Sequence, residues 1–394
     1  MPKVIHESDV EENVLGILED LRYEIIRGED EEYLPGGRLA LRADYKAVVL
    51  VERLREALRR INASISEEAR EQAVKQVLRS ESQKLIAGNE SFHRMLVDGI
   101  DVPVQSEEGE SYQKVWLFDF KNPESKNNQF LAVNQFTVIE NNIERRPDVV
   151  LFVNGIPLLI LELKNLADED ATIWTAYDQF QTYTEQLPSL FRYNEILVIS
   201  DGIEARAGTI TSEKERFMQW KTIDGEKPKK GFTEIEVLLR GICEKERLLD
   251  IVRNFVVFEK DKETKKKLAA YHQYWAVNKA IESTKSARKG NKKAGIVWHT
   301  QGSGKSLTMI FYSGKLVREL DNPTIVLLND RNDLDGQLFE TFGRCQDILR
   351  QKPVQAESKT IAGTAKSFLR RCSVHDDTEV LSRRGQGKAS SSFR

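Results

Sequence analysis

The sequence has little cysteine and no cysteine pair. Its 394 residues include three cysteines, Cys243, Cys345 and Cys372, which lie far apart. This spacing fits neither a disulfide framework nor a CxxC-type metal site, so neither organises the fold. Such cysteine usage is typical of a reducing compartment, and we expect a cytoplasmic location.

Long apolar segments and a strong charge of one sign are also missing. The start, MPKVIHESDVEENV, is charged and lacks the apolar core of a signal peptide, and the longest apolar stretch is interrupted by Asn154, Gly155 and Pro157. We therefore expect neither secretion nor membrane insertion. The formal net charge is only -3, so any nucleic-acid-binding surface would have to be a local patch.

The chain has the length and composition of a globular protein with two or three domains. Hydrophobic residues make up 40% and charged residues 31%, which is ordinary for soluble proteins. Segments 9–27 and 47–61 show helical apolar spacing, whereas strand-like runs begin near residue 112. A new strand, turn and helix pattern follows residue 260, and we expect the Ser- and Arg-rich tail to be poorly ordered.

A glycine-rich loop, HTQGSGKS, separates an apolar strand expected at 296–298 from an apolar-periodic helix. Small residues let backbone N–H groups face phosphate oxygens at a helix N-terminus. Lys305 would then reach the β and γ phosphates of ATP, and Ser306 would ligate Mg²⁺. His299 departs from the general pattern, and an ordinary glycine-rich turn is the alternative. On this chemistry the expected phosphate-binding residues are Gly302, Gly304, Lys305 and Ser306.

Two residues outside the loop could serve the same region. The amide of Gln273, on the preceding helix, could read the edge of adenine, although it could equally be a helix surface residue. The apolar run at 324–328 predicts the next parallel strand, and Arg331 after it could contact a nucleic-acid phosphate. A solvated turn is the alternative for Arg331.

The segment RRPDVVLFVNGIPLLILELKN, residues 145–165, predicts two apolar strands around an Asn-Gly turn, with charges at their ends. Asp148 and Glu162 could supply hard oxygen ligands to Mg²⁺, and Lys164 could orient or activate water for phosphodiester hydrolysis. Charges at the ends of buried strands are costly unless they are paired or metal-bound. The alternative is that Asp148 pairs with a neighbouring arginine and Glu162 with Lys164 near solvent.

Strand parity constrains this site. A regular two-residue turn at Asn154-Gly155 would place Asp148 and Glu162 on opposite faces of the hairpin. We therefore predict an odd loop or a bulge, with a three-residue loop pairing Phe152 with Ile156 as the explicit case. Gln179 and Tyr183, four residues apart on the next helix, could face DNA or the metal from one side.

Together these segments resemble the restriction subunit, the endonuclease and motor, of type I restriction-modification enzymes. The resemblance runs from about residue 5 to 345 and rests on six motifs in one order: the segment 145–165, QFQTY, ISDGIEARAG, YHQYWAV, HTQGSGKS and DRNDLDGQL. It implies an α/β fold, with a PD-(D/E)xK endonuclease-like mixed sheet and flanking helices at 1–258. A partial RecA-like P-loop lobe of a superfamily 2 helicase would follow at 259–350, and an atypical tail at 351–394.

The resemblance also implies residue roles, cofactors and partners. Asp148, Glu162 and Lys164 match the nuclease triad, Gln179 and Tyr183 its accessory element, and Gln273 the adenine-reading glutamine. The first helicase motif matches the whole loop, so the resemblance implies ATP binding by His299, Thr300, Gln301, Gly302, Ser303, Gly304, Lys305 and Ser306. Expected cofactors are Mg²⁺ and ATP, and expected partners are double-stranded DNA with methylation and specificity subunits. The family would continue into a second helicase motif where this chain has VHDDTEV. We therefore expect no sustained ATPase or translocation from this chain alone; a non-catalytic DNA-binding or assembly module is the rival function.

Overall fold

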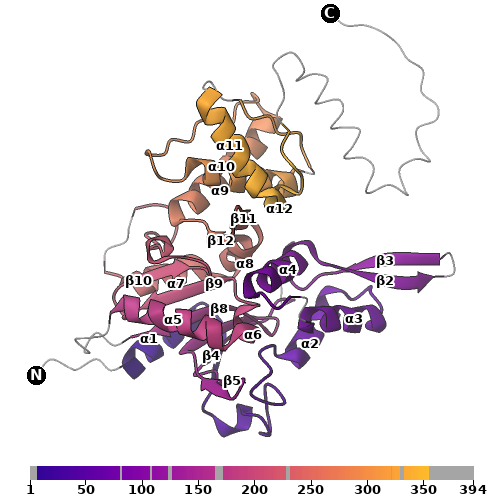
Figure 1. The fold of residues 1–394 in the computed structure, drawn as a ribbon, viewed down its shortest axis with the longest axis vertical. Helices are drawn as coiled ribbons and strands as arrows, with labels where there is room; N and C mark the ends of the chain where they lie inside the picture. Colours follow the sequence, from indigo (N-terminus) through magenta and orange to yellow (C-terminus); the bar gives the residue numbers. More distant parts are fainter. Residues whose placement is uncertain are drawn as a thin grey trace, which may run out of the picture.

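The computed structural model describes residues 7–79, 82–106, 109–122, 127–164, 172–227, 231–320, 322–328 and 332–354. A sheet-containing body forms one end of the molecule, and a smaller helical part formed by the later residues stands above it (Figure 1). Among the described residues, no helix is both long enough and apolar enough to cross a membrane. Arg331, Cys372 and VHDDTEV lie outside the described residues.

The body is built on a mixed six-stranded sheet, in agreement with the expected α/β class. Two pairs of neighbours, β1 with β4 and β8 with β9, are parallel and the others are antiparallel. Strands β4, β7, β8 and β9 are buried along their whole length, which explains their continuous apolar sequences. In order across the sheet, the strands are β1 (Glu24–Arg27), β4 (Phe130–Asn134), β7 (Val149–Val153), β8 (Ile156–Leu163), β9 (Ile196–Ser200) and β10 (Ala205–Gly208).

Helices from the beginning, middle and end of this part of the chain cover the sheet. Helix α1 (Glu7–Asp20) packs on β1, β4 and α7 (Glu234–Ile242), while α5 (Ile173–Gln186) packs on β8 and β9. The helical expectation for 9–27 was too long, because residues 24–27 pair with β4 instead. Smaller elements surround the body: η1 (Glu31–Tyr33), α2 (Val51–Ile61), α3 (Glu67–Leu78), α4 (Leu85–Asp98), β2 (Ile100–Ser106), β3 (Gly109–Val115), β5 (Val138–Glu140), β6 (Ile143–Arg145), α6 (Pro188–Phe191), η2 (Lys214–Arg216) and α8 (Lys245–Asn254).

A two-stranded hairpin connects the body to the upper helices. The hairpin pairs β11 (Val256–Lys260) with β12 (Thr264–Leu268), and the chain then enters α9 (Tyr271–Lys289). The boundary proposed at residue 258 thus falls inside β11. The upper part holds α9, α10 (Lys305–Glu319), α11 (Asn332–Arg344) and α12 (Gln346–Leu349), with α10 packed against the other three.

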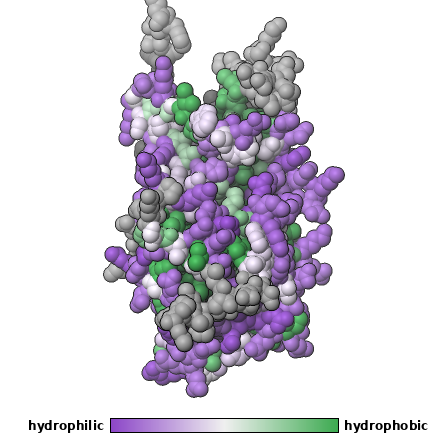
Figure 2. Space-filling model, turned by 90° about the vertical axis from the view of Figure 1, so that its left-hand side faces the viewer, coloured by the Kyte–Doolittle hydropathy of each residue, from purple (hydrophilic) through white to green (hydrophobic). Residues whose placement is uncertain are grey.

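The strands expected at 296–298 and 324–328 are absent from the described part of the chain. These residues have no regular secondary structure, and Ile296 and Trp298 are 96% and 80% exposed. A strand is stable only when a neighbour completes its hydrogen bonds, and no described segment pairs with either run. Seen from the side, the surface is mostly hydrophilic, with separate hydrophobic patches that include the upper end (Figure 2).

Candidate functional site

The β7–β8 hairpin closes with a two-residue turn. Val153 pairs with Ile156, and Asn154 and Gly155 both have positive φ, 53° and 79°. This is the conformation that Asn-Gly favours in tight hairpins. The three-residue loop expected here was therefore wrong, because the turn chemistry of Asn-Gly determines the local loop length.

A bulge in β8 restores the register that the site needs. Phe152 pairs with Pro157, but Leu151 pairs with Leu159, so Leu158 is the extra residue. The prediction of a bulge is confirmed. Beyond it Val149 pairs with Leu161, and one step further along the same register Asp148 stands opposite Glu162, on one face of the hairpin.

Asp148 is held from two directions. Asp148 is only 7% exposed, and its Oδ2 accepts a hydrogen bond from the backbone N–H of Leu163 at 2.7 Å. Its Oδ1 lies 3.5 Å from Nε2 of Gln135. The salt-bridge alternative paired Asp148 with a neighbouring arginine. In the structure Arg145 donates to Gln186 and Arg146 pairs with Glu29.

Glu162 and Lys164 form a close ion pair at the end of β8. The Lys164 Nζ lies 3.0 Å from Glu162 Oε1, as the alternative interpretation expected. The pair is not near solvent, however, because Glu162 is fully buried and the Lys164 side chain is only 14% exposed. The backbone N–H of Lys164 donates to Ser200 at the end of β9, which fixes the start of its side chain.

Helix α5 brings Gln179 and Tyr183 to this cluster. The Gln179 Nε2 donates to the Tyr183 Oη at 2.6 Å. Burial, and then the nearby charge of Glu162, raise the pKa of Tyr183 to about 12, and Asp148 contributes in the same direction. The phenol therefore stays protonated, and it is electrostatically coupled to both carboxylates.

Three residues near the site, Gln135, Asn134 and Glu11, belong to none of the sequence motifs. Gln135, which has a positive φ of 49°, donates its side-chain amide to Glu11 of α1 as well as approaching Asp148. Its neighbour Asn134 donates to the same Glu11 carboxylate at 2.6 Å. Glu11 lies more than 120 residues away in sequence, so only the packing of α1 on β4 brings it here.

The donor set fits Mg²⁺. Mg²⁺ is typically bound through one or two carboxylates together with waters and substrate phosphates. Asp148 and Glu162 supply two such carboxylates on one face, beside a lysine. A site with three or more acidic, histidine or cysteine ligands is not found in the described part of the chain.

The glycine-rich loop leads directly into α10. Gly304, with φ of 79°, is the residue before that helix, and the exposed Lys305 begins it. A cavity of about 720 Å³ lies beside the loop, with Gly302, Ser303 and Gly304 in its lining. The peptide N–H groups at this helix N-terminus suit an anionic phosphate.

Gln273 is joined to this loop rather than exposed on its helix. It is 4% exposed, its Nε2 donates to the Gly304 carbonyl at 3.1 Å, and its Oε1 accepts the N–H of Ala270 at 2.9 Å. Close by, the His272 and His299 rings lie 5.5 Å apart. Burial, His272 and Lys305 lower the pKa of His299, which favours its neutral form.

Comparison with known proteins assigns both regions to families. The model described as Type I restriction enzyme R protein N terminus matches residues 5–216, more than half of the chain. The chain belongs to this family. The model of the SWI2/SNF2 ATPase matches residues 272–367, which includes Gln273 and the glycine-rich loop.

Relatives within the R protein family are considerably longer than this chain. It is 43% identical over 369 residues to the type I restriction enzyme HindI endonuclease subunit of Haemophilus influenzae, covering 90% of this chain and 34% of the relative. It is 34% identical over 328 residues to the putative type I restriction enzyme MjaIXP endonuclease subunit of Methanocaldococcus jannaschii, covering 76% and 31%. The chain therefore spans about a third of the length of these R proteins.

Proposed function

We propose that this chain carries the DNA-cleaving site of a type I restriction enzyme and hydrolyses phosphodiester bonds of double-stranded DNA with Mg²⁺. The observation that carries the proposal is the placement of Asp148 opposite Glu162, with Lys164 3.0 Å from Glu162. Two carboxylates and an amine gathered on one face are better explained by a metal-dependent site for a phosphate substrate than by three charges with independent structural roles.

Each residue has a distinct role in this proposal. Asp148 and Glu162 would hold Mg²⁺, which when bound supplies a Lewis acid that offsets negative charge on the phosphate. Lys164 would orient the attacking water through its ammonium group, and its buried stem limits the positions it can take. Protonated Tyr183 would donate a hydrogen bond toward the same face.

The helical part would add nucleotide binding. Lys305 and Ser306 begin α10 directly after the glycine loop, where Lys305 would contact ATP phosphates and Ser306 would ligate the accompanying Mg²⁺. Gln273 would support adenine recognition while anchoring Gly304. DNA and the methylation and specificity subunits are the proposed partners. The domain limits 1–258, 259–350 and 351–394 remain part of this proposal, as does Arg331 as a DNA contact.

The test uses Lys164→Ala with Lys114→Ala as the control, since Lys114 also pairs with a carboxylate, that of Asp101, but lies on the β3 strand. We expect Lys164→Ala to reduce plasmid nicking in Mg²⁺ by about 100-fold or more while DNA binding is retained. Lys114→Ala should leave both unchanged. Unchanged nicking in Lys164→Ala, or a wild-type chain that neither nicks plasmid nor binds Mn²⁺ by calorimetry, would favour the assembly-module function.

A further inference from the structure

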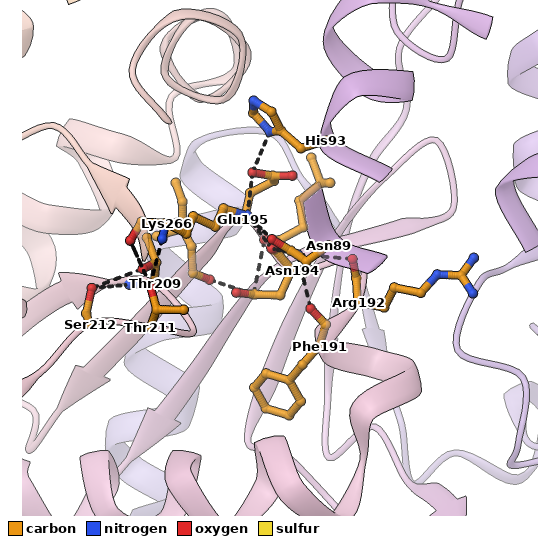
Figure 3. Close-up of polar contacts among 12 residues, drawn as sticks. Asn89, His93, Phe191, Arg192, Asn194, Glu195, Thr209, Thr211, Ser212 and Lys266 are labelled. Atoms are coloured by element: carbon orange, nitrogen blue, oxygen red, sulfur yellow. Dashed lines mark hydrogen bonds and ion pairs between the residues drawn. The ribbon is translucent and has the colours of Figure 1, made fainter. Parts of the chain in front are cut away.

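A buried ion pair lies at the other end of β8 and β9, away from the nuclease site. The Lys266 Nζ of β12 lies 2.7 Å from Glu195 Oε2, and both side chains are fully buried. The same ammonium donates to Asn89 Oδ1 at 2.9 Å and to the Asn194 carbonyl at 2.7 Å. Three N–H donors thus meet three acceptors around a fully buried ammonium group (Figure 3).

The cluster joins segments that are distant in the sequence. His93 of α4 lies 3.0 Å from the same Glu195 oxygen, and the side-chain amide of Asn89 donates to the carbonyls of Phe191, Arg192 and Asn194. Burial opposes ionisation of Glu195, but His93 and Lys266 outweigh it and lower its pKa. Glu195 is therefore a carboxylate at neutral pH, and its position is tied to α4 and to β12 together.

This cluster reaches the bulge of β8 through two hydrogen bonds. The backbone N–H of Glu195 donates to the carbonyl of Leu158 at 2.7 Å. The side-chain amide of Asn194 donates to that same carbonyl at 3.2 Å, and to Ile196 at 2.8 Å. Leu158 is the extra residue of the bulge. The carbonyl of the bulged residue is thus satisfied by the loop that Lys266 and Asn89 hold.

The bulge in turn decides which face Glu162 occupies. A slip of one residue in β8 would move Glu162 to the face opposite Asp148, because side chains alternate along a strand. Resting on the function proposed above, we propose that Lys266, Glu195 and Asn194 form a positioning unit, which fixes the Leu158 carbonyl and so keeps Glu162 opposite Asp148. None of the three contacts the site itself.

The energetics agree with such a role. Burying two charges costs several kcal/mol per ion before their attraction is counted, so a buried pair is weak evidence for stability but a means of specifying one arrangement. An apolar pair would pack here without directing the 194–195 loop. An ammonium with three fixed acceptors admits one position of that loop.

The test compares Lys266→Met with Lys315→Met in the full chain. Lys315 is also a buried lysine, 2.5 Å from Asp250, but it lies on α10 away from β8. The readout is the amide NMR signal of Leu163 in ¹⁵N-leucine-labelled protein, because this N–H donates to Asp148 across the bulged hairpin and so reports a change of register. Plasmid nicking is measured alongside as kcat and as KM for DNA.

We expect folded Lys266→Met to shift the Leu163 signal and to lower kcat at least tenfold with KM little changed, while Lys315→Met alters neither. A Leu163 signal identical to wild type in the folded variant overturns the proposal. A shifted signal in a chain that never cuts DNA supports the positioning unit while refuting the nuclease function. If Lys266→Met does not fold, the double variant Glu195→Gln, Lys266→Met, which removes both charges of the Lys266–Glu195 pair, is judged by the same criteria.

Discussion

The carboxylate of Asp148 accepts the backbone N–H of Leu163 at 2.7 Å, across the β7–β8 ladder and one residue beyond Glu162. This bond links the register of the hairpin to the orientation of an acidic side chain. The Asp148 carboxylate therefore has a structural role besides the metal binding that we propose for it, and different substitutions at Asp148 separate the two roles.

Asp148→Asn should abolish cleavage without unfolding the hairpin. The amide oxygen still accepts from Leu163, but a neutral ligand binds Mg²⁺ poorly, so nicking should fall by about 100-fold or more. Asp148→Ala should lose cleavage equally and also about 1–3 kcal/mol of unfolding free energy, because the Leu163 N–H is left unsatisfied. Urea unfolding measures the stability effect and plasmid nicking measures the cleavage effect. Equal stability of Asp148→Asn and Asp148→Ala would contradict the structural role of the hydrogen bond to Leu163.

Tyr183→Phe should lower the rate of plasmid nicking modestly and leave the shape of its pH dependence unchanged. The substitution removes the acceptor of the Gln179 amide, which should cost about 1 kcal/mol of stability, and nicking should fall severalfold. Because the pKa of Tyr183 is raised to about 12, its ionisation should cause no change in the nicking rate below pH 10. Tyr177→Phe on the same helix, whose hydroxyl donates to Ser212, is the control; a limb near pH 10 that vanishes in Tyr183→Phe would contradict the argument.

The hairpin shows how far the sequence predicts the site. The three-residue loop given as the explicit case was wrong, because Asn-Gly favours the two-residue turn that the hairpin has. Strand parity also predicted a bulge as the other way to bring Asp148 opposite Glu162, and a bulge is present. Its position at Leu158 could not be predicted, since the groups that satisfy its carbonyl come from Asn194 and Glu195, 36 or more residues away.

The nucleotide region shows a different limit of sequence reasoning. Gln273 was expected near the adenine, and no sequence pattern indicates that its amide also holds the Gly304 carbonyl. The apolar composition of 296–298 predicted a strand, but composition does not supply a neighbouring strand. The helix at 9–27 was overextended because Ile25 and Ile26 fit helical spacing and strand pairing with β4 equally well.

Gly304→Ala should weaken ATP binding more than Gly302→Ala. Both glycines have φ of 79°, so alanine costs about 1–2 kcal/mol of backbone strain at either position. Only at Gly304 would the new Cβ lie 2.7 Å from the Gln273 Nε2, whereas at Gly302 it meets open space. Displacing Gln273 breaks its bond to the loop, which adds about 1 kcal/mol. Titration with a fluorescent ATP analogue measures both variants, and equal losses would show that Gln273 does not hold the loop.

Glu195→Gln should lower the free energy of unfolding at neutral pH, and this loss relative to wild type should become smaller as the pH falls. At neutral pH the substitution leaves Lys266 without its counter-charge, and breaking a buried pair in this way costs about 3–5 kcal/mol. The pKa of Glu195 is lowered in the folded chain, so its stabilisation is fully present above the unfolded value near 4.5 and is lost as pH falls through the folded pKa. Urea unfolding at pH 7, 5, 4 and 3 should therefore show a large gap that closes below pH 4.5. Exposed Glu213, paired with Lys265, provides the control Glu213→Gln, which should show little gap at any pH. A Glu195→Gln gap that stays constant down to pH 3 would mean that folding does not lower the pKa of Glu195, and a gap that widens would mean that folding raises it.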